Sequence, residues 1–375
     1  MYQLNKNQIT TANSCGTMEY ETIQKNGTKQ KNQISRENLR ILTILKFVFF
    51  IGLTIVVSIS CSDKDNKNDT NTNIWDSNVD VYVVGTYSGG DAAIWKNGIQ
   101  TMFPKVGVGA YNTNTAKSVF VLGNDVYVAG GNEYVGPSVL WKNGVPTTLS
   151  TDATVGSVYV AGNDVYVTGS RTTANNTVPI LWKNGTETIL AASGSASSVY
   201  VAGNDVYVVG EDDGYWGGNA VLWKNGIPTN LPGEVGMARS IFVARNDIFI
   251  VGTAEDDNGV NEAALWKNGI LSILPGKMGD AKSVYVVGND VYVVGQTYDE
   301  NGYYRATLWK NGVLSLLPFT DANEKWSSAN SIYVIGNDVY VAGHTNQEST
   351  LWKNGVPIIL ENSGGPANSV FVVSH

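Results

Sequence analysis

Three stretches of the sequence combine acidic with aromatic or amide side chains. They read "EDDGYWGG" (211–218), "AEDDNGVNE" (254–262) and "TYDENGYYR" (297–305), and their starts lie 43 residues apart. Grouped carboxylates can bind a cation or a basic partner. In none of the three does a glycine stand where an EF-hand calcium loop requires it. Turn formation and solubility explain the same residues without a ligand, because Asp, Asn and Gly favour tight turns.

Large aromatic side chains in the first and third stretch, with one tryptophan further along, are the candidate ligand-binding residues. In exposed loops, such rings suit sugars or a protein partner. The candidates are Tyr215, Trp216, Tyr298, Tyr303, Tyr304 and Trp326. A further hypothesis places a cation at the acidic residues 211–213, 255–257 and 299–300. Packing of the aromatic rings onto the rest of the protein is the alternative.

Other kinds of chemistry lack the residues that they need. The two histidines are His344 and His375 and the two cysteines are Cys15 and Cys61, so a multi-histidine site, a cysteine metal site and a disulfide framework are unavailable to the repeats. A glycosidase needs two carboxylates facing each other across a cleft. Outside the three acidic stretches, the candidate carboxylates are only scattered: Glu234, Asp280, Asp321 and Glu324. We therefore predict no catalytic residue, no metal site and no cofactor.

The distribution of charge narrows the range of partners. The whole chain carries a net charge of −8, but residues 1–61 hold seven Lys/Arg and three Asp/Glu. The remaining residues hold 18 basic and 30 acidic side chains, a net charge of −12. A strongly acidic body without a basic stripe argues against nucleic acid as a partner.

The elements that carry these loops recur along the chain. The tetrapeptide Trp-Lys-Asn-Gly occurs seven times at intervals of 41–46 residues. Its copies begin at Trp95, Trp141, Trp182, Trp223, Trp266, Trp309 and Trp352. A period of this length with strand-like composition is typical of propellers and related arrays. Because the tryptophans have the same place in every copy, packing in the core is favoured over a ligand-binding role.

Each copy contains four predicted strands. In the third copy "SVYVAGNDVYVTGS" precedes "PILWKNGTETIL", with a variable loop between them. "SVYV", "DVYVTG", "ILWK" and "TETIL" are strands A, B, C and D, and the dipeptides "GN" and "NG" join A to B and C to D as tight turns. Apolar residues occupy both alternating positions, so both faces of each sheet should be buried between neighbouring sheets.

The count of strands predicts a closed ring. Strand B occurs seven times, beginning at Asp80, Asp125, Asp164, Asp205, Asp247, Asp290 and Asp338. Strand A also occurs seven times, beginning at Ser118, Ser157, Ser198, Ser240, Ser283, Ser331 and Ser369. The first unit opens on strand B and the chain ends on an extra strand A, so residues 369–373 should pair with strand B near residues 80–85. A linear solenoid, the alternative, would not need this arrangement.

This arrangement resembles the closure of β-propeller families, in which strand A is innermost and the two chain ends share a blade. The resemblance covers residues 76–375. It implies an all-β fold, a seven-bladed β-propeller of four-stranded antiparallel blades closed by the C-terminal strand. It implies little about the ligand, because propellers carry many unrelated functions.

A propeller of this kind has two different faces. The short A–B and C–D turns form one, here called the scaffold face, and the B–C and D–A loops, which carry nearly all of the variation, form the loop face. Binding surfaces are usually built on such variable loops. On the loop face Lys117, Arg239 and Lys282 precede strand A around the expected channel mouth, where they could attract an anion or offset the acidic loops.

Two features of the scaffold face concern the fold itself. The aspartate that starts strand B and the lysine that ends strand C should be cross-strand partners that fix the register. Five of the six comparable A–B turns read Gly-Asn-Asp, but the fifth blade has Arg245-Asn246-Asp247. If the glycines are used for positive φ, Arg245 must accept strain or force another turn type.

The sequence before the repeats predicts export to a membrane. Residues 47–60 are apolar or small, Lys46 precedes them and Cys61 follows. This resembles a bacterial lipoprotein signal, which implies a lipidated Cys61 as the mature N-terminus, although Ser58 replaces the usual aliphatic residue. The polar stretch "SDKDN" that follows resembles the surface-export signals of propeller-repeat lipoproteins from the Bacteroidota. An uncleaved anchor over about residues 41–60 is the alternative.

These observations lead to one organisation and one leading function. Residues 1–61 are an N-terminal extension with the signal peptide, 62–75 a flexible tether and 76–375 the propeller. We expect a monomeric protein, lipid-anchored in the outer membrane of a bacterial envelope, whose loop face binds glycan or protein without catalysis. A propeller-type carbohydrate-active enzyme (hydrolase or lyase) and a purely structural surface or adhesion module are the alternatives.

Overall fold

The structure, a computed structural model, describes two short N-terminal strands by their backbone and most of residues 75–375. Within the latter range, residues 88, 107–113, 133–135, 175, 213–217, 234, 257 and 322 are not described. The chain divides into two compact units, Met1–Thr72 and Asn73–His375. In the first, β1 (Met18–Ile23) and β2 (Lys29–Ile34) pair as an antiparallel sheet.

The predicted apolar segment 47–60, Cys61 and residues 62–74 of the tether lie outside the described residues. Among the residues that the structure does describe, no helix is long and apolar enough to cross a membrane. The lipoprotein signal and the division of the chain at residues 61 and 75 therefore stay predictions.

The second unit consists of seven four-stranded antiparallel sheets, each in the order A–B–C–D. The first blade comprises β30 (Ser363–Ser374), β3 (Val79–Tyr87), β4 (Ala92–Lys96) and β5 (Ile99–Met102). The second comprises β6 (Thr115–Leu122), β7 (Asp125–Gly131), β8 (Ser138–Lys142) and β9 (Val145–Ser150). The third comprises β10 (Ala153–Ala161), β11 (Asp164–Thr172), β12 (Thr177–Lys183) and β13 (Thr186–Ile189).

The remaining four blades follow the same plan. The fourth comprises β14 (Ser195–Ala202), β15 (Asp205–Glu211), β16 (Ala220–Lys224) and β17 (Ile227–Asn230). The fifth comprises β18 (Gly236–Ala244), β19 (Asp247–Glu255), β20 (Asn261–Lys267) and β21 (Ile270–Ile273). The sixth comprises β22 (Lys277–Val287), β23 (Asp290–Tyr298), β24 (Tyr304–Lys310) and β25 (Val313–Leu316). The seventh comprises β26 (Ser327–Ile335), β27 (Asp338–Thr345), β28 (Glu348–Lys353) and β29 (Val356–Ile359).

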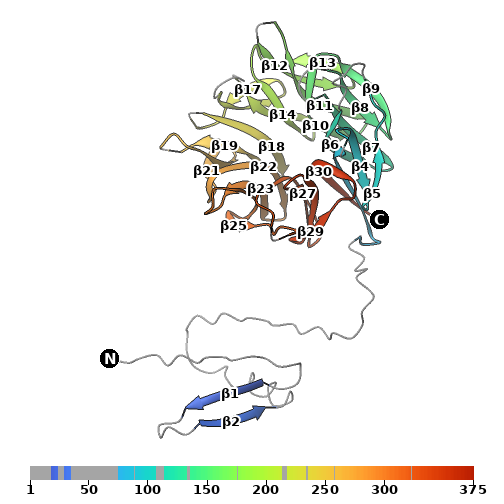
Figure 1. Ribbon diagram of the computed structural model, residues 1–375. Helices are drawn as coiled ribbons and strands as arrows, with labels where there is room; N and C mark the ends of the chain where they lie inside the picture. The colour runs from blue at the N-terminus through green and yellow to red at the C-terminus, as the bar shows by residue number, and fades with distance from the viewer. Residues whose placement is uncertain are drawn as a thin grey trace. The chain divides into compact units, whose positions relative to one another are not determined.

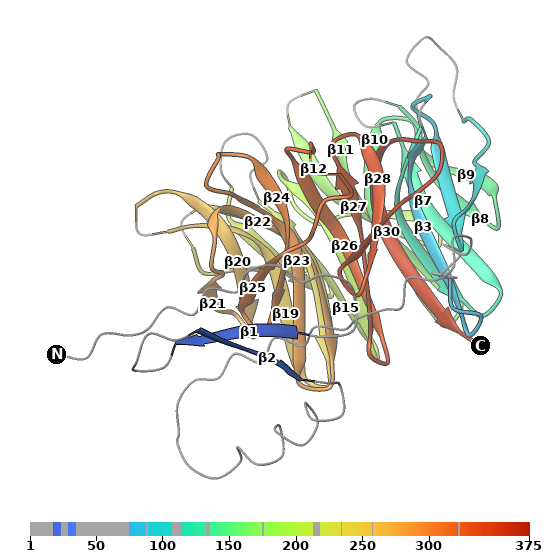
Figure 2. The same cartoon turned by 60° about the horizontal axis from the view of Figure 1, so that its bottom comes forward.

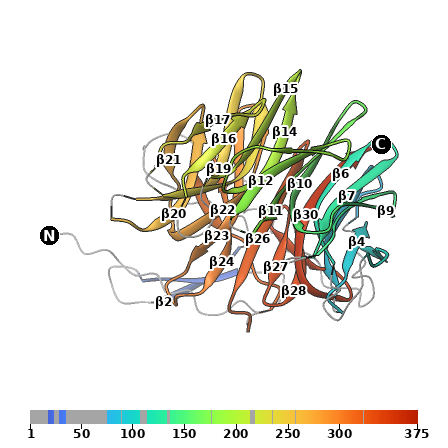
Figure 3. The same cartoon turned by 90° about the horizontal axis from the view of Figure 1, so that it is seen from above.

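The seven sheets are arranged as blades around an axis. In Figure 1 the A strands of this unit lie towards its centre and the D strands, such as β9, β13, β21 and β29, at its periphery. Figure 3 shows neighbouring blades packed side by side. The predicted fold class, a seven-bladed β-propeller of four-stranded antiparallel blades, is confirmed.

The hairpin turns of the scaffold face have the geometry that their sequences require. In the seven C–D turns the asparagine has a φ of 50–53° and the glycine a φ of 78–80°. Positive φ at both central residues defines a type I′ turn, whose twist matches that of the flanking strands. In the A–B turns the first central residue alone has positive φ, 58–60°, as in a type II′ turn.

An aspartate, a lysine and an asparagine repeat one set of contacts in all seven blades. In the first blade Asp80 Oδ2 lies 2.7 Å from Lys96 Nζ, and Asp80 Oδ1 accepts a hydrogen bond from Asn97 Nδ2 at 2.8 Å. Asn97 Oδ1 accepts another from the backbone N–H of Val81 at 2.8 Å. In the other blades the Asp–Lys distances are 2.7–3.8 Å. The predicted cross-strand pair is confirmed, and the turn asparagine adds a link that helps to fix the register.

The C-terminal strand closes the ring. β30 pairs with β3, with Val373 opposite Asp80 and Val370 opposite Val83. The predicted pairing of this strand with the first strand B is therefore confirmed, in the predicted register. His375 also donates its backbone N–H to the carbonyl of Asn78 at 3.0 Å. The two chain ends of the propeller thus take the place of the A–B turn that the first blade lacks.

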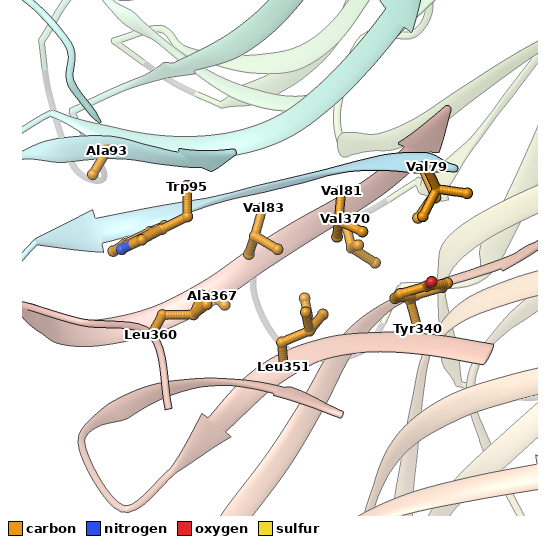
Figure 4. Packing of buried hydrophobic residues seen from close by; sticks show 12 residues of the cluster. Val79, Val81, Val83, Ala93, Trp95, Tyr340, Leu351, Leu360, Ala367 and Val370 are labelled. Atoms are coloured by element: carbon orange, nitrogen blue, oxygen red, sulfur yellow. The ribbon is translucent and has the colours of Figure 1, made fainter. Parts of the chain in front are cut away.

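Each blade packs its apolar face on the next one. Figure 4 shows this contact between the first and seventh blades, where Val83, Trp95 and Val370 approach Leu351 and Leu360. The Trp-Lys-Asn-Gly tryptophans are 0–1% exposed in all seven blades, so the predicted core role is confirmed. Burying so large a ring stabilises the inter-blade contact by several kcal/mol, on the order of 3–5.

Four of these indoles also make a hydrogen bond between blades. Trp266, Trp309 and Trp352 donate their indole N–H to the carbonyls of Pro232, Pro275 and Pro318, at 2.7–2.8 Å. Trp95 donates to the carbonyl of Glu361 at 3.0 Å. The acceptors lie in the D–A loop that leads into the blade of the tryptophan, so these bonds attach the loop face to the core.

Seven aromatic side chains, one from each strand A, form a closed set around the axis, here called the aromatic wheel. They are Phe120, Tyr159, Tyr200, Phe242, Tyr285, Tyr333 and Phe371. Neighbouring ring centroids lie 4.8–5.2 Å apart, with interplanar angles of 46–54°. Neighbouring blades are related by one seventh of a full turn, about 51°. The interplanar angles are close to this rotation, which is expected when the plane of each ring runs parallel to the axis of the propeller.

Serines at the start of strand A connect each blade to the next one. Ser157 Oγ accepts a hydrogen bond from the backbone N–H of Val199 in the following blade at 3.0 Å. Five equivalent bonds of 3.1–3.4 Å occur at other blade boundaries. The innermost strand has an unpaired edge, and these hydroxyls satisfy amides that would otherwise lack a partner in the protein.

Arg245 takes the backbone conformation of the glycines that it replaces. Its φ is 58°, within the range of the five glycines at the same turn position. Of the two alternatives for Arg245, strain or another turn type, the first therefore applies, because a β-carbon is unfavourable at this φ. Its Nη1 donates to Asn289 Oδ1 of the neighbouring A–B turn at 3.3 Å, an exposed contact.

We expect Arg245→Gly to raise the free energy of unfolding by about 1 kcal/mol, because relief of backbone strain exceeds the entropic cost of a glycine in the unfolded chain. Urea denaturation measures the change. Gly288→Ala is the matched control: Gly288 has a φ of 60° and nothing within 4 Å of an added β-carbon, so the variant tests the backbone alone. It should be destabilised. Equal or lower stability of Arg245→Gly would contradict the strain argument.

Candidate functional site

A recess on the loop face lies where the seventh blade has the shortest loop. Its B–C connection consists of Asn346 and Gln347, whereas the other six blades use four to eight residues there. The D–A loop that leads into the same blade is long, residues 317–326, while five of the other six such connections have five residues or fewer. A long loop beside a short one leaves space between them.

This space is a pocket of about 770 Å³. Its lining combines an indole with carboxylates, carboxamides, a hydroxyl and one aliphatic side chain. The lining residues are Thr320, Asp321, Asn323, Glu324, Trp326, Asn346, Gln347, Glu348 and Ile359. The volume is within the range of sites for small ligands.

Trp326 is the predicted binding residue that lines the pocket. Its side chain is 40% exposed, unlike the fully buried tryptophans of the repeat. The indole lies edge-on to the His344 ring, with the ring centroids 5.4 Å apart. This contact orients the indole, and the exposed part of the ring is available to a ligand.

Two of the carboxylates at the pocket stabilise the long loop. Glu324 accepts hydrogen bonds from the backbone N–H and the hydroxyl of Thr320. Asp321 Oδ1 accepts two from Asn323, at 2.7 Å from its backbone nitrogen and 2.8 Å from its side chain. Glu348, the first residue of β28, is exposed. The loop under Trp326 is thus held by its own polar side chains.

The three predicted tyrosines of the sixth blade lie on one hairpin. Tyr298 and Tyr304 are opposite each other on β23 and β24, with ring centroids 4.1 Å apart. Their mutual hydrogen bond, together with burial, raises the pKa of Tyr304 to about 12. Tyr303 is exposed, and Lys325 Nζ lies 6.0 Å from its ring centroid. This contact links the hairpin to the loop that carries Trp326.

Part of the predicted site lies outside the described residues, including Tyr215, Trp216 and residues 213 and 257. In the described part of the acidic stretches, Asp256 and Asp299 accept hydrogen bonds from backbone N–H groups of their own turns. These bonds lower the pKa of both carboxyls, chiefly through Val260 and Tyr303.

No group of three or more potential metal ligands comes together among the residues that the structure describes. The cation hypothesis for residues 211–213, 255–257 and 299–300 stays a prediction. The Asp256 and Asp299 carboxylates already accept hydrogen bonds within their own hairpins, which is the turn chemistry named as the alternative.

Two of the three basic residues predicted at the channel mouth, Arg239 and Lys282, join neighbouring blades. Arg239 Nε lies 2.6 Å from Asp280 Oδ1 of the next blade. Lys282 Nζ donates to Ser328 Oγ at 2.8 Å and to Asn330 Oδ1 at 3.2 Å, again in the next blade. Asp280 belongs to β22 and to none of the three acidic stretches, so the two alternatives for these basic residues stay predictions.

The surroundings of Lys282 disfavour the charged form of its amine. Burial lowers the pKa of its amine to about 8, Asp280 opposes this shift and Arg239 adds to it. Lys117, at the equivalent position of the second blade, also takes part in an interaction. Arg239 is paired with a carboxylate and Lys282 is enclosed by neutral oxygens, so these two residues are less accessible to an anion than solvated cations would be.

His344 is a residue that the sequence analysis did not select for the site. It lies opposite Ser328, the acceptor of Lys282, and in contact with Trp326. Burial and the nearby charge of Lys282 lower its pKa to about 4, so the ring is neutral at neutral pH. Its Nδ1 is buried without a hydrogen-bond partner among the described residues. His344 thus connects the Trp326 pocket to the channel mouth.

Several solved structures are similar to this fold. A puromycin hydrolase mutant complexed with PGG has a TM-score of 0.51 at 9% identity, over 76% of this chain and 52% of that one. A puromycin-hydrolyzing peptidase from Mycobacterium tuberculosis has 0.49 at 10% identity, over 74% and 53%. The β-propeller domain of the Trilobed protease from Pyrococcus furiosus has 0.48 at 12% identity, over 77% and 94%.

The likeness to the puromycin hydrolase mutant concerns the fold alone. The chain spans about half the length of the two hydrolases. At identities of 12% or less, they carry no activity over to this chain. No family model matches the sequence, and no curated protein matches it.

Proposed function

We propose that the protein is a membrane-anchored, non-catalytic binding scaffold that binds a glycan at the Trp326 pocket. The observation that carries this proposal is an exposed indole in a pocket otherwise bordered mostly by polar side chains. Sugar rings present C–H groups that pack on an indole, and hydroxyls that pair with carboxylates and carboxamides. Glu348, Asn346 and Gln347 supply such groups at the pocket.

The preorganisation of this region supports binding. The loop that carries Trp326 is held by Glu324 and Asp321, the indole by His344 and the neighbouring hairpin by Lys325. A pocket whose walls are already ordered loses little conformational entropy when a ligand binds. The repeated scaffold face, by contrast, places the same contacts in every blade.

We also propose that lipid at Cys61 anchors the protein in the outer membrane of a bacterial envelope, with residues 62–75 as the tether. The support is the sequence: an apolar stretch of signal-peptide length, Ser60 before the cysteine and a polar run after it. A cysteine that carries several acyl chains would bind a membrane stably, whereas one chain binds marginally.

A carbohydrate-active enzyme is a second candidate, because three carboxylates border the same pocket. Asp321 and Glu324 stabilise the loop through hydrogen bonds. Glu348 is the third carboxylate of the lining and does not take part in those bonds. A hydrolase needs a pair of such groups across the scissile bond. This candidate would be supported over the scaffold if the protein released product from a bound oligosaccharide. Glu348→Gln should then abolish product release and retain binding.

We expect Trp326→Ala to weaken glycan binding at least about tenfold, since stacking on the indole contributes about 1.5 kcal/mol. A glycan array identifies the ligand, and calorimetry with that oligosaccharide measures the dissociation constant. Because Trp326 is exposed, the melting temperature should change little. Tyr304→Ala is the matched control, an exposed aromatic residue outside the pocket lining. Equal losses in both variants, or none in Trp326→Ala, would contradict the proposal.

A further inference from the structure

The scaffold face carries a repeated set of exposed aliphatic side chains. The first residue of strand D, directly after the Asn-Gly turn, is Ile or Val in six blades and Thr186 in the third. The six side chains, here called the aliphatic crown, are 61–75% exposed: Ile99, Val145, Ile227, Ile270, Val313 and Val356. Single exposed apolar residues are normal, but these six occupy the same position in their blades, directly after the C–D turns that form the scaffold face.

A lysine accompanies each residue of the crown. Ile270 is opposite Lys267 on the neighbouring strand, and Val313 is opposite Lys310. These lysine side chains are about half exposed while they pair with the aspartates of strand B. An aliphatic residue beside a long amphipathic lysine suits the boundary between lipid and water.

The chain enters the propeller on this same face. Trp75, the first described residue of the second unit, packs on the C–D turn of the first blade, where a β-carbon at Gly98 would lie 2.7 Å from Trp75 Cζ2. β3 then begins at Val79 beside the end of β30. In Figure 2 the C-terminal end of β30 lies at the lower end of its blade. The B–C hairpin of β11 and β12, on the loop face, lies at the upper end of the propeller in the same view.

The repeated turns of the scaffold face carry little of the protein's acidic charge. Of the 18 basic side chains after residue 61, seven are the lysines of the repeated pairs and an eighth is Arg245, while seven of the 30 acidic side chains are their aspartate partners. These turns therefore have a net charge of +1. Beyond Asp76, which itself lies where the chain enters on this face, the other 8 basic and 19 acidic side chains have a net charge of −11. An anionic surface repels the strongly negative part of the protein, but it does not repel the turns of the scaffold face.

We propose that the scaffold face contacts a lipid bilayer through the aliphatic crown, which directs the loop face away from the membrane. This rests on the proposed anchor at Cys61. Thirteen residues separate Cys61 from Trp75. A flexible tether of that length spans about 20 Å, so weak contacts at the crown act at high effective concentration. Because the crown lies around the rim of a ring, a broad flat partner can meet all six residues at once.

Fluorescence quenching in vesicles tests this orientation. The full chain is expressed so that it is processed, and the lipid-bound protein is reconstituted in vesicles containing phosphatidylglycerol and doxyl-labelled lipid. Single cysteines at Ile270→Cys and at Asn301→Cys, an exposed loop-face residue, carry the same fluorophore. We expect the label at position 270 to be quenched at least about threefold more than the label at position 301.

Controls separate the orientation from the anchor. An acylated Cys61 does not react with the fluorophore, so labelling of the parent chain would refute the lipid anchor and, with it, this proposal. In Ile270→Ser/Val313→Ser/Val356→Ser, quenching at position 301 should rise, because the contact is lost while the anchor remains. Thr186 at the same position of the third blade indicates that the fold accepts a polar residue there. Equal quenching at positions 270 and 301 in chains whose other crown residues are unchanged, or quenching at neither position, would overturn the proposal. Crown labels that lipid does not quench but a co-purified protein protects would assign the face to a protein partner.

Discussion

Removal of residues 368–375 is expected to abolish the folded monomer and to yield aggregated protein. The deletion takes away most of β30 and leaves β3 as an unpaired edge. It also exposes the apolar surface that Val370 and Val372 cover, and it removes Phe371 from the aromatic wheel. A free edge next to exposed apolar residues is a template for association. Size-exclusion chromatography and circular dichroism measure the outcome.

A shorter deletion is the matched control. Removal of Ser374 and His375 alone takes away exposed residues and keeps Val373 paired with Asp80. This variant should remain monomeric, with a melting temperature close to that of the intact protein. A monomeric 368–375 deletion with an unchanged melting temperature would mean that closure of the ring contributes little to stability.

Trp309→Ala is expected to lower the free energy of unfolding by about 3–5 kcal/mol, because the indole is fully buried between two blades and its removal leaves a cavity. The variant also loses the hydrogen bond from the indole to Pro275. Denaturation in urea measures the difference. Trp326→Ala, which removes an exposed indole, should cost less than about 1 kcal/mol.

A pair of conservative variants separates the cavity from the hydrogen bond. Trp141 Nε1 is buried without a hydrogen-bond partner among the described residues, whereas Trp309 Nε1 donates to a carbonyl. Trp309→Phe should therefore be less stable than Trp141→Phe by about 1 kcal/mol. Similar losses in the two variants would show that the indole hydrogen bond adds nothing to the packing.

The blade architecture could be predicted because its signals are local and repeated. An Asn-Gly dipeptide between two apolar runs specifies a type I′ turn, and seven copies show φ values within a few degrees of one another. The missing first strand A and the extra last one determined the closure, which β3 and β30 form in the expected register. The role of the Asp and Lys also followed from their places at the ends of paired strands.

The pocket could not be predicted in the same way, because it depends on two loops that are separate in sequence. Taken separately, Asn346 and Gln347 form an ordinary short hairpin and residues 317–326 an ordinary long loop. The space arises because the fold brings the two loops together. Trp326 was predicted from its residue type, whereas His344 was noted only in a count of histidines. Its position beside Trp326 and near Lys282 required the structure.

The role of the channel-mouth residues also depended on contacts across blades. The sequence places Lys117, Arg239 and Lys282 before strand A but cannot show what lies opposite them in the next blade. Asp280 pairs with Arg239, and neutral oxygens of the seventh blade surround the amine of Lys282. Such partners are separated by more than forty residues, about one repeat, and the loops that precede strand A vary between repeats.

The aromatic wheel limits how the number of blades can change during evolution. Tandem repeats as similar as these are prone to unequal recombination, which inserts or deletes one whole unit. Closure by the last strand would survive such an event, because each unit contains one strand of every kind. The wheel would not, since six or eight rings would require rotations of about 60° or 45° in place of about 51°. A change in copy number would therefore require new residues at Phe120, Tyr159 and the equivalent positions, whereas a change of ligand requires new loops alone.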